Sequence, residues 1–163
     1  RYSKRLLHFM YRMLNHDEER AQDLLQDLFV QLVEKPKGFD TSRKFKPWVF
    51  TVAANLCRKE YRKINHVSAS DNEYQLNEVA SSTDGLIAPI DSKVFKKHLK
   101  RELLNLSYEQ RTVFVLRNQE KFSLNEIAEV MECSLGTVKS RLFYATKTLA
   151  EKLVEFKPLY QNY

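Results

Sequence analysis

A strongly basic helical face, with aromatic residues just before it, lies within residues 45–64. Apolar side chains recur there at helical spacing, so the opposite stripe of the same helix carries four cations and an amide. Such cations can follow a phosphate backbone, and rings beside them can stack on unpaired bases, as binding of single-stranded nucleic acid requires. The alternative is a solvated face, and most of the aromatics are expected in the core. The polar stripe is Thr51, Asn55, Arg58, Lys59, Arg62 and Lys63, and the aromatics are Phe39, Phe45, Trp48 and Phe50.

A second set of nucleic-acid-binding side chains follows Leu135. Hydroxyls and cations crowd into the first turns of an expected helix, where they can donate to phosphates and to the acceptor edge of guanine in a major groove. The N-terminus of a helix favours phosphate as well. The candidates for DNA contact are Thr137, Lys139, Ser140, Arg141, Tyr144 and Lys147.

The helix that carries this second set is expected to be the second helix of a helix-turn-helix. Ser123 and Glu126 have the spacing of a capping box, so one helix begins there, and Glu132-Cys133-Ser134 forms a short turn before the next. Helices over 93–106 and from Ser107, capped by that serine, would support the pair. A helical hairpin that only packs is the alternative. The contacts between the two helices are expected from Ile127, Ala128, Met131, Cys133, Val138 and Leu142.

An amphipathic helix capped by Asp17 is expected in the first third of the chain, after a shorter helix around residues 6–14. Its polar face would count as solvated surface if residue types alone were considered. The apolar stripe is Ala21, Leu24, Leu25, Leu28, Phe29, Leu32 and Val33, and the opposite face carries Gln22, Asp23, Gln26, Asp27 and Gln31.

Composition favours an all-α protein and excludes several functional classes. The three glycines, Gly38, Gly85 and Gly136, lie too far apart for a phosphate-binding loop, so hydrolysis of a nucleotide is not expected. The uncharged run over residues 49–57 is about half of the roughly 20 residues that a membrane span needs. Two cysteines do not form a disulfide framework, which favours a reduced, cytoplasmic protein. The four histidines lack metal-ligand spacing, so neither a metal nor a cofactor is expected.

The net charge of +6 over 163 residues is unevenly distributed. Residues 1–66 carry 14 Lys/Arg against 8 Asp/Glu, residues 67–92 carry none against 5, and residues 93–163 carry 13 against 8. The middle segment also holds a run of Ser, Thr, Asp and Gly, which is typical of a linker. We therefore expect two small helical domains, 1–66 and 93–163, joined by a flexible acidic linker over 67–92.

Both basic blocks resemble segments of a bacterial RNA polymerase sigma factor of the extracytoplasmic-function (ECF) group. They occur in the family's order and together cover most of the chain. The first block is similar to sigma regions 2.2–2.4 in Ala21-Gln22-Asp23-Leu24-Leu25-Gln26-Asp27-Leu28-Phe29, Phe39-Asp40 and Phe45-x-x-Trp48-x-Phe50-x-Val52-Ala53-x-Asn55. The second is similar to region 4 in Arg111-x-Val113-Phe114-x-Leu116-Arg117, Ser123-x-x-Glu126-Ile127-Ala128-Glu129 and Gly136-Thr137-Val138-Lys139-Ser140-Arg141-Leu142.

The resemblance gives each face a role. It implies that Asp23, Gln26 and Asp27 bind the clamp helices of the largest core polymerase subunit, and that region 4 also meets the flap. It implies that region 4 recognises the −35 element as duplex DNA. The linker would pass through the RNA exit region, where its negative charge suits a cationic channel. An anti-sigma factor is a further implied partner. The residues assigned to recognising and melting the −10 element are Trp48, Asn55, Arg58, Lys59, Arg62 and Lys63.

The sequence thus predicts a non-catalytic initiation subunit, without catalytic residues, that opens promoter DNA without ATP. One alternative is a two-domain helix-turn-helix regulator that acts without core polymerase, although this leaves the basic face of residues 45–64 unexplained. The other is a metal-dependent nuclease, which would need Asp17, Asp23, Asp27 and Asp40 to converge on a metal although they form no such motif. Binding to promoter DNA alone or only with core polymerase would separate the first alternative from a sigma factor.

Overall fold

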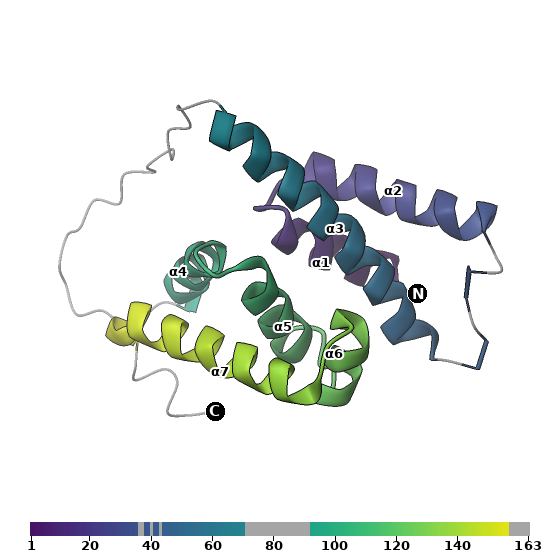
Figure 1. Cartoon of the computed structure of the whole chain (residues 1–163). Coiled ribbons are helices and arrows are strands. Elements are labelled where there is room, and N and C mark those ends of the chain that lie inside the picture. The colour runs from purple at the N-terminus through teal and green to yellow at the C-terminus, as the bar shows by residue number, and fades with distance from the viewer. Residues whose placement is uncertain (36–37, 40, 43, 71–91, 157–163) are drawn as a thin grey trace.

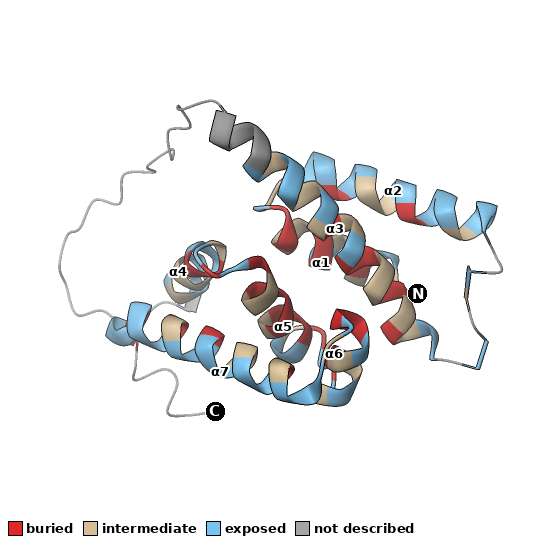
Figure 2. Ribbon diagram, in the orientation of Figure 1, coloured by how far each residue is buried: buried red, intermediate tan, exposed pale blue. Residues whose placement is uncertain are grey.

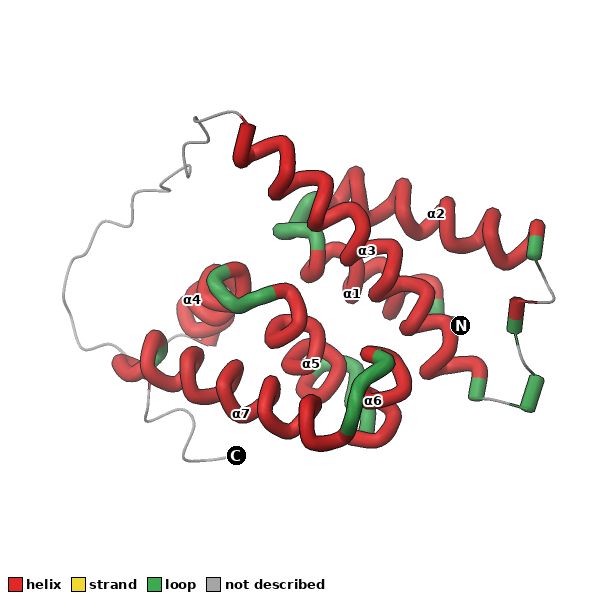
Figure 3. Tube along the Cα trace, in the orientation of Figure 1, coloured by secondary structure: helices red, strands yellow, loops and turns green. Residues whose placement is uncertain are grey.

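The computed structural model describes residues 1–35, 38–39, 41–42, 44–70 and 92–156, with only the backbone described at 66–70 and 92. Within these ranges the chain forms α-helices joined by short loops, and no strand (Figures 1 and 3). The expected all-α class is therefore confirmed. The helices are α1 (Ser3–Met13), α2 (Glu18–Glu34), α3 (Phe45–Ser70), α4 (Ser92–Leu104), α5 (Tyr108–Asn118), α6 (Leu124–Met131) and α7 (Leu135–Lys152), followed by a 3-10 turn, η2 (Val154–Phe156).

Side-chain caps fix where four of the helices begin. The Asp17 carboxylate accepts a hydrogen bond from the amide of Arg20 at 3.0 Å, and Ser107 accepts from the third residue after it in the same way. At α6 the capping box is complete, because Ser123 and Glu126 each accept from the other's backbone amide. Ser134 caps α7. Each cap satisfies an amide that the first turn would otherwise leave unpaired, so the expected starts of α2, α5 and α6 are confirmed.

The first three helices pack around a buried cluster that includes Phe9, Met10 and Phe50. The apolar stripe expected for α2 is only partly correct. Leu28 is buried, whereas Phe29 is 41% and Val33 80% exposed. These two side chains lie at the edge of the stripe and in the second half of the helix, which projects from the bundle (Figure 2).

The last four helices form the second bundle, in which α5, α6 and α7 contain the helix-turn-helix. A separate small core joins α4 to the end of α7 and η2 through Leu103, Leu149 and Phe156. The predicted fourth helix at 93–106 is thus present with slightly different bounds. The linker expected over 67–92 lies almost entirely outside the described residues, although α3 continues to Ser70, four residues into that segment.

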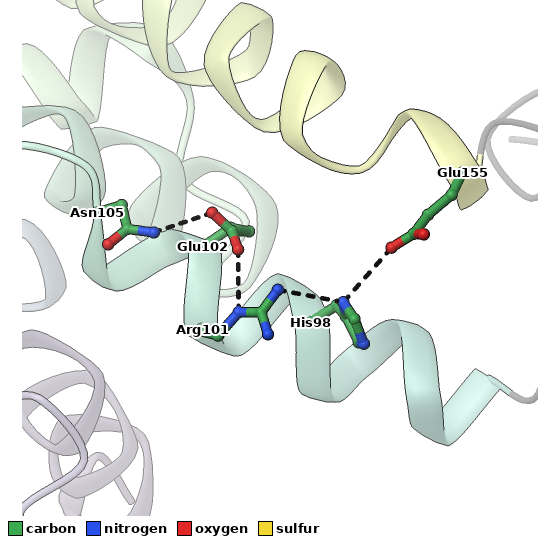
Figure 4. A network of polar contacts seen from close by, with 5 residues as sticks. All are labelled: His98, Arg101, Glu102, Asn105 and Glu155. Atoms are coloured by element: carbon green, nitrogen blue, oxygen red, sulfur yellow. Dashed lines mark hydrogen bonds and ion pairs between the residues drawn. The ribbon is translucent and has the colours of Figure 1, made fainter. Parts of the chain in front are cut away.

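A polar network supports the contact between α4 and η2 (Figure 4). Glu102, which is 8% exposed, accepts hydrogen bonds from Asn105 at 2.9 Å and Arg101 at 3.0 Å. Arg101 also contacts His98, whose Nδ1 lies 3.6 Å from Glu155 Oε1. Burial alone would raise the pKa of Glu102, but the hydrogen bonds and positive charge around it outweigh burial and lower that pKa. The carboxylate therefore stays ionised and holds the end of α4.

The two bundles share one continuous apolar core. Helix α3 lies against α6, and α1 lies against α5 (Figure 1). The Phe50 and Phe122 rings are 5.0 Å apart and both are fully buried, and the Tyr108 hydroxyl donates to the backbone oxygen of Ala54 at 2.7 Å. At the rim, Arg5 Nε lies 2.9 Å from a carboxylate oxygen of Glu120. The interface between bundles is thus packed like a protein interior.

Arg111 is the largest polar group at this junction and is only 1% exposed. Its guanidinium donates to the backbone oxygen of Met13, to the side-chain oxygen of Asn15 and to the backbone oxygen of Leu104. It also lies 5.6 Å from the centre of the Tyr61 ring. One side chain on α5 therefore joins α4, the end of α1 and the turn that follows it.

A histidine in the turn between α1 and α2 makes the junction sensitive to acid. His16 is half-buried and has a left-handed backbone, with φ of 65°. Burial and the positive charges of Lys100, Arg111 and Arg12 lower its pKa from 6.5 to about 4. Between about pH 4 and pH 6.5, His16 of the unfolded chain binds a proton that His16 of the folded chain does not. The stabilisation associated with neutral His16 is therefore complete above pH 6.5 and is lost as the pH falls towards 4.

Replacing His16 with Asn is expected to reduce the pH dependence of stability between pH 6.5 and 4.5. Asn tolerates the left-handed conformation and does not titrate. The measurement is the urea midpoint of wild type, His16→Asn and the exposed control His8→Asn across that range. A slope that is unchanged in His16→Asn would mean that other groups cause the acid sensitivity.

Candidate nucleic-acid interface

The basic stripe of α3 lines an open hollow of about 520 Å³. All five of its lining residues come from this helix, at intervals that place them on one side of it. The sequence prediction is thus correct that these residues share a face. The lining residues are Asn55, Arg58, Lys59, Arg62 and Lys63.

The cations of this hollow differ in how firmly they are held. Arg58 donates to Asn55 at 3.1 Å and lies 5.6 Å from the Tyr108 ring, so it is fixed against α5. Lys63 lies 3.3 Å from Glu60 Oε2. Lys59 and Arg62 are exposed, and within the described ranges neither makes an ion pair. These two side chains are the most available for a phosphate.

Trp48 lies apart from the hollow, almost two helical turns nearer the start of α3. Its ring centre is 4.8 Å from that of Phe39 and 5.7 Å from that of Phe45, and those two rings are 5.4 Å apart. Trp48 and Phe39 are half-buried and Phe45 is 39% exposed, whereas Phe50 is in the core. The expectation that most of these aromatics are core holds fully for Phe50 only. The other three form a partly open cluster beside the basic face.

The outer face of α7 presents a second group of donors. The helix packs through Val138, Ala145 and Leu149, so residues on its far side are free of the core. Lys139, Ser140 and Lys147 are all exposed there, as is Tyr144 at 54%. Four of the six side chains predicted for DNA contact are therefore accessible together.

The other two predicted residues on α7 are partly engaged within the protein. Thr137 is half-buried, and its hydroxyl lies 2.9 Å from that of the capping Ser134. Arg141 is also half-buried and donates to the Cys133 sulfur in the turn at 3.7 Å. Both side chains thus have a contact inside the protein, so the exposed Lys139 and Ser140 are the better placed residues.

A third surface, on α2, combines acidic, amide and apolar side chains. Asp23, Gln26 and Asp27 are all exposed. Next to them lie Phe29 and Val30, 41% and 52% exposed. Sequence reasoning identified the polar members and missed the apolar ones, because helical periodicity assigned Phe29 to the core and Val30 to neither face. Such a mixed surface is typical of a docking site for a protein.

Other site chemistries find little support in the described part of the chain. No group of three or more His, Cys, Asp or Glu there is arranged to hold a metal ion. Cys57 and Cys133 are free thiols, and burial raises the pKa of Cys57. No described helix combines the length and apolarity that a membrane span requires.

Two family models match the chain. Residues 1–66 match sigma-70 region 2, and residues 97–149 match sigma-70 region 4. The first match contains α1, α2 and most of α3, and the second contains the helix-turn-helix. The basic faces of α3 and α7 thus both fall within matched regions.

Individual relatives agree with these matches over most of their length. The ECF RNA polymerase sigma factor SigW of Bacillus subtilis is 28% identical over 93% of this chain and 84% of its own. The ECF RNA polymerase sigma factor SigL of Mycobacterium tuberculosis is 31% identical over 87% and 79%. Among solved structures, the sigma factor RpoE of Bartonella quintana, in complex with the anti-sigma factor NepR, superposes with a TM-score of 0.72 at 26% identity, covering 93% of this chain and 91% of that one.

Proposed function

Since the chain belongs to the ECF family of RNA polymerase sigma factors, we propose that its three exposed faces divide the work of promoter-specific initiation. The outer face of α2 binds core polymerase, α3 recognises and melts the −10 element, and α7 contacts the −35 element as duplex DNA. The first two roles fall to residues 1–66 and the third to residues 93–163. The observation that carries the proposal is the presence of two separate basic faces, one beside aromatic rings and one on a recognition helix.

The α3 face suits a strand that has left the duplex. Opening DNA requires on the order of 1.4 kcal/mol per base-pair step. Stacking of a base on an aromatic ring contributes about 1–3 kcal/mol, and phosphate contacts add to it. The cluster around Trp48 and the cations Lys59 and Arg62 supply both kinds of contact. Melting by binding energy needs no nucleotide hydrolysis, so the protein acts here as a binding subunit and not as an enzyme.

Partners follow from the same assignment. Helix α2 contacts the clamp helices of core polymerase, and the second bundle contacts the polymerase flap. An anti-sigma factor is the expected regulatory partner, because the similar RpoE is bound to one. The proposed place of action is the cytoplasm, where polymerase and promoter DNA are found.

Charge reversal on α2 tests the core-binding surface. Asp27→Arg is expected to weaken binding to core polymerase by more than tenfold, because it places a long cation beside the exposed Phe29 and Val30, where a docked partner must exclude water. Affinity is measured by titrating labelled core polymerase without DNA. Glu18→Arg, at the start of the same helix on its opposite side, is the matched control. Equal affinities for the two variants would remove Asp27 from the interface.

Run-off transcription with core polymerase and a promoter library tests the function as a whole. The chain should bind DNA specifically only together with core polymerase, and transcripts should start at a shared promoter sequence. Tight, specific duplex binding by the isolated chain would favour the independent helix-turn-helix regulator. Failure to bind core polymerase or to direct initiation would contradict the proposal.

A further inference from the structure

An exposed aromatic pair lies on the outer face of α7. Phe143 is 62% and Tyr144 54% exposed, and their ring centres are 5.4 Å apart in an edge-to-face arrangement. Of the ten phenylalanines in the chain, Phe143 is the most exposed. Sequence reasoning included Tyr144 among the DNA-contacting residues and passed over Phe143, because an apolar residue in an amphipathic helix is normally assigned to the core.

The surroundings of Phe143 are basic and polar. One turn before it on the helix lie Lys139 and Ser140, and one turn after it lies Lys147, all exposed. The helix packs through its other side. The Phe143 ring, with Tyr144 at its side, is therefore an apolar contact point framed by two cations and a hydroxyl. A protein partner would need an apolar pocket between acidic groups, whereas duplex DNA offers phosphates for the lysines on either side of a groove.

Within the major groove, an apolar ring can distinguish one base. Thymine presents a C5-methyl group there, while the other bases present hydrogen-bond donors and acceptors at their edges. Phenylalanine has no hydrogen-bonding group, so its favourable contact is with that methyl. Tyr144 packs against one edge of the ring and restricts its position.

We propose that Phe143 is a specificity-determining residue that selects thymine at one position of the −35 element by contacting its C5-methyl group. This rests on the proposed function, in which α7 contacts the −35 duplex. Lys139 and Lys147 place the helix on the phosphates, and Phe143 adds the choice of base.

Replacement of single thymines by deoxyuridine isolates the methyl group, because the two bases pair identically. The full chain is assembled with core polymerase, and the −35 element is taken from the promoter library. Wild-type holoenzyme is expected to bind about fourfold more weakly when one particular thymine is replaced, which corresponds to about 0.8 kcal/mol for a buried methyl-sized group. Phe143→Ala should weaken binding to the thymine promoter to a similar extent and show no difference between thymine and deoxyuridine at that position.

Two further variants control the experiment. Phe143→Leu keeps an apolar side chain and should retain most of the discrimination. Val154→Ala removes an equally exposed apolar residue from η2, outside α7, and should behave as wild type. Urea midpoints of all variants are compared with that of wild type, and we expect them to be unchanged because both side chains are exposed.

The outcomes separate this proposal from the function on which it rests. If Phe143→Ala keeps the wild-type discrimination between thymine and deoxyuridine, or loses affinity equally for all −35 sequences, the assignment of Phe143 is wrong while the sigma-factor function stands. The second result would instead point to a protein contact. If wild-type holoenzyme has no −35 preference at all, the role of α7 fails and the assignment of Phe143 fails with it.

Discussion

Replacing Arg111 with Ala is expected to lower the free energy of unfolding by roughly 3–4 kcal/mol. The substitution removes a guanidinium that is 1% exposed and leaves the oxygens on Met13, Asn15 and Leu104 without this donor, and the bond to Met13 is fully buried. It also opens a cavity where the bundles meet. The midpoint and slope of urea unfolding measure the loss.

Two variants show which part of Arg111 matters. Arg111→Met fills most of the space but donates nothing, so it should recover only the packing part of the loss. Arg62→Ala removes the same side chain from an exposed position on α3 and should change stability little. If Arg111→Ala and Arg62→Ala unfold at the same urea concentration, the hydrogen bonds of Arg111 do not hold the bundles together.

Removing three cations from α3 is expected to make promoter binding much less dependent on salt. Each contact with single-stranded phosphate contributes about 0.7 to the slope of log affinity against log salt concentration. The holoenzyme carrying Lys59→Ala, Arg62→Ala and Lys63→Ala together should therefore have a slope smaller by about 2, and a lower affinity at any one salt concentration. Filter binding to a promoter with an open −10 element, at several potassium concentrations, gives this slope.

The matched control removes the same charge elsewhere. Lys4, Lys96 and Lys97 are exposed cations on α1 and α4, and replacing them with Ala changes net charge equally. If DNA binding followed overall charge, the two triple variants would have the same slope. A smaller slope in the α3 variant alone would locate the phosphate contacts on the proposed face.

Local signals were enough to predict where helices begin and which polar residues share a face. Ser123 and Glu126 cap α6 through atoms three residues apart, and the cations of α3 are adjacent by helical geometry alone. Such features depend on short separations along the chain, so the sequence contains what determines them. The family-level prediction rested on motifs of this local kind.

Features that depend on distant contacts could not be predicted in the same way. Arg111 was recognised as part of a motif, but its burial depends on Met13, almost a hundred residues earlier. Periodicity placed Phe29 and Val33 on the core face, yet none of the described helices covers them. Arg141 is less available than expected because Cys133 in the preceding turn accepts its hydrogen bond. For Arg111 the deciding neighbour lies far outside the motif that suggested its role, whereas Cys133 lies within the helix-turn-helix itself and only the folded turn brings its sulfur to Arg141.

The shared core between the bundles limits how far the molecule can reach. A compact chain of this length has a radius of gyration of about 15 Å and is roughly 40 Å across. The −35 and −10 elements are about 25 base pairs apart, which is roughly 85 Å of DNA. To contact both at once, α3 and α6 must separate and expose Phe50 and Phe122 to new surroundings. Binding to core polymerase therefore has to separate the two bundles as well as position them on the DNA. The stability of the shared core sets how tightly polymerase must bind each bundle.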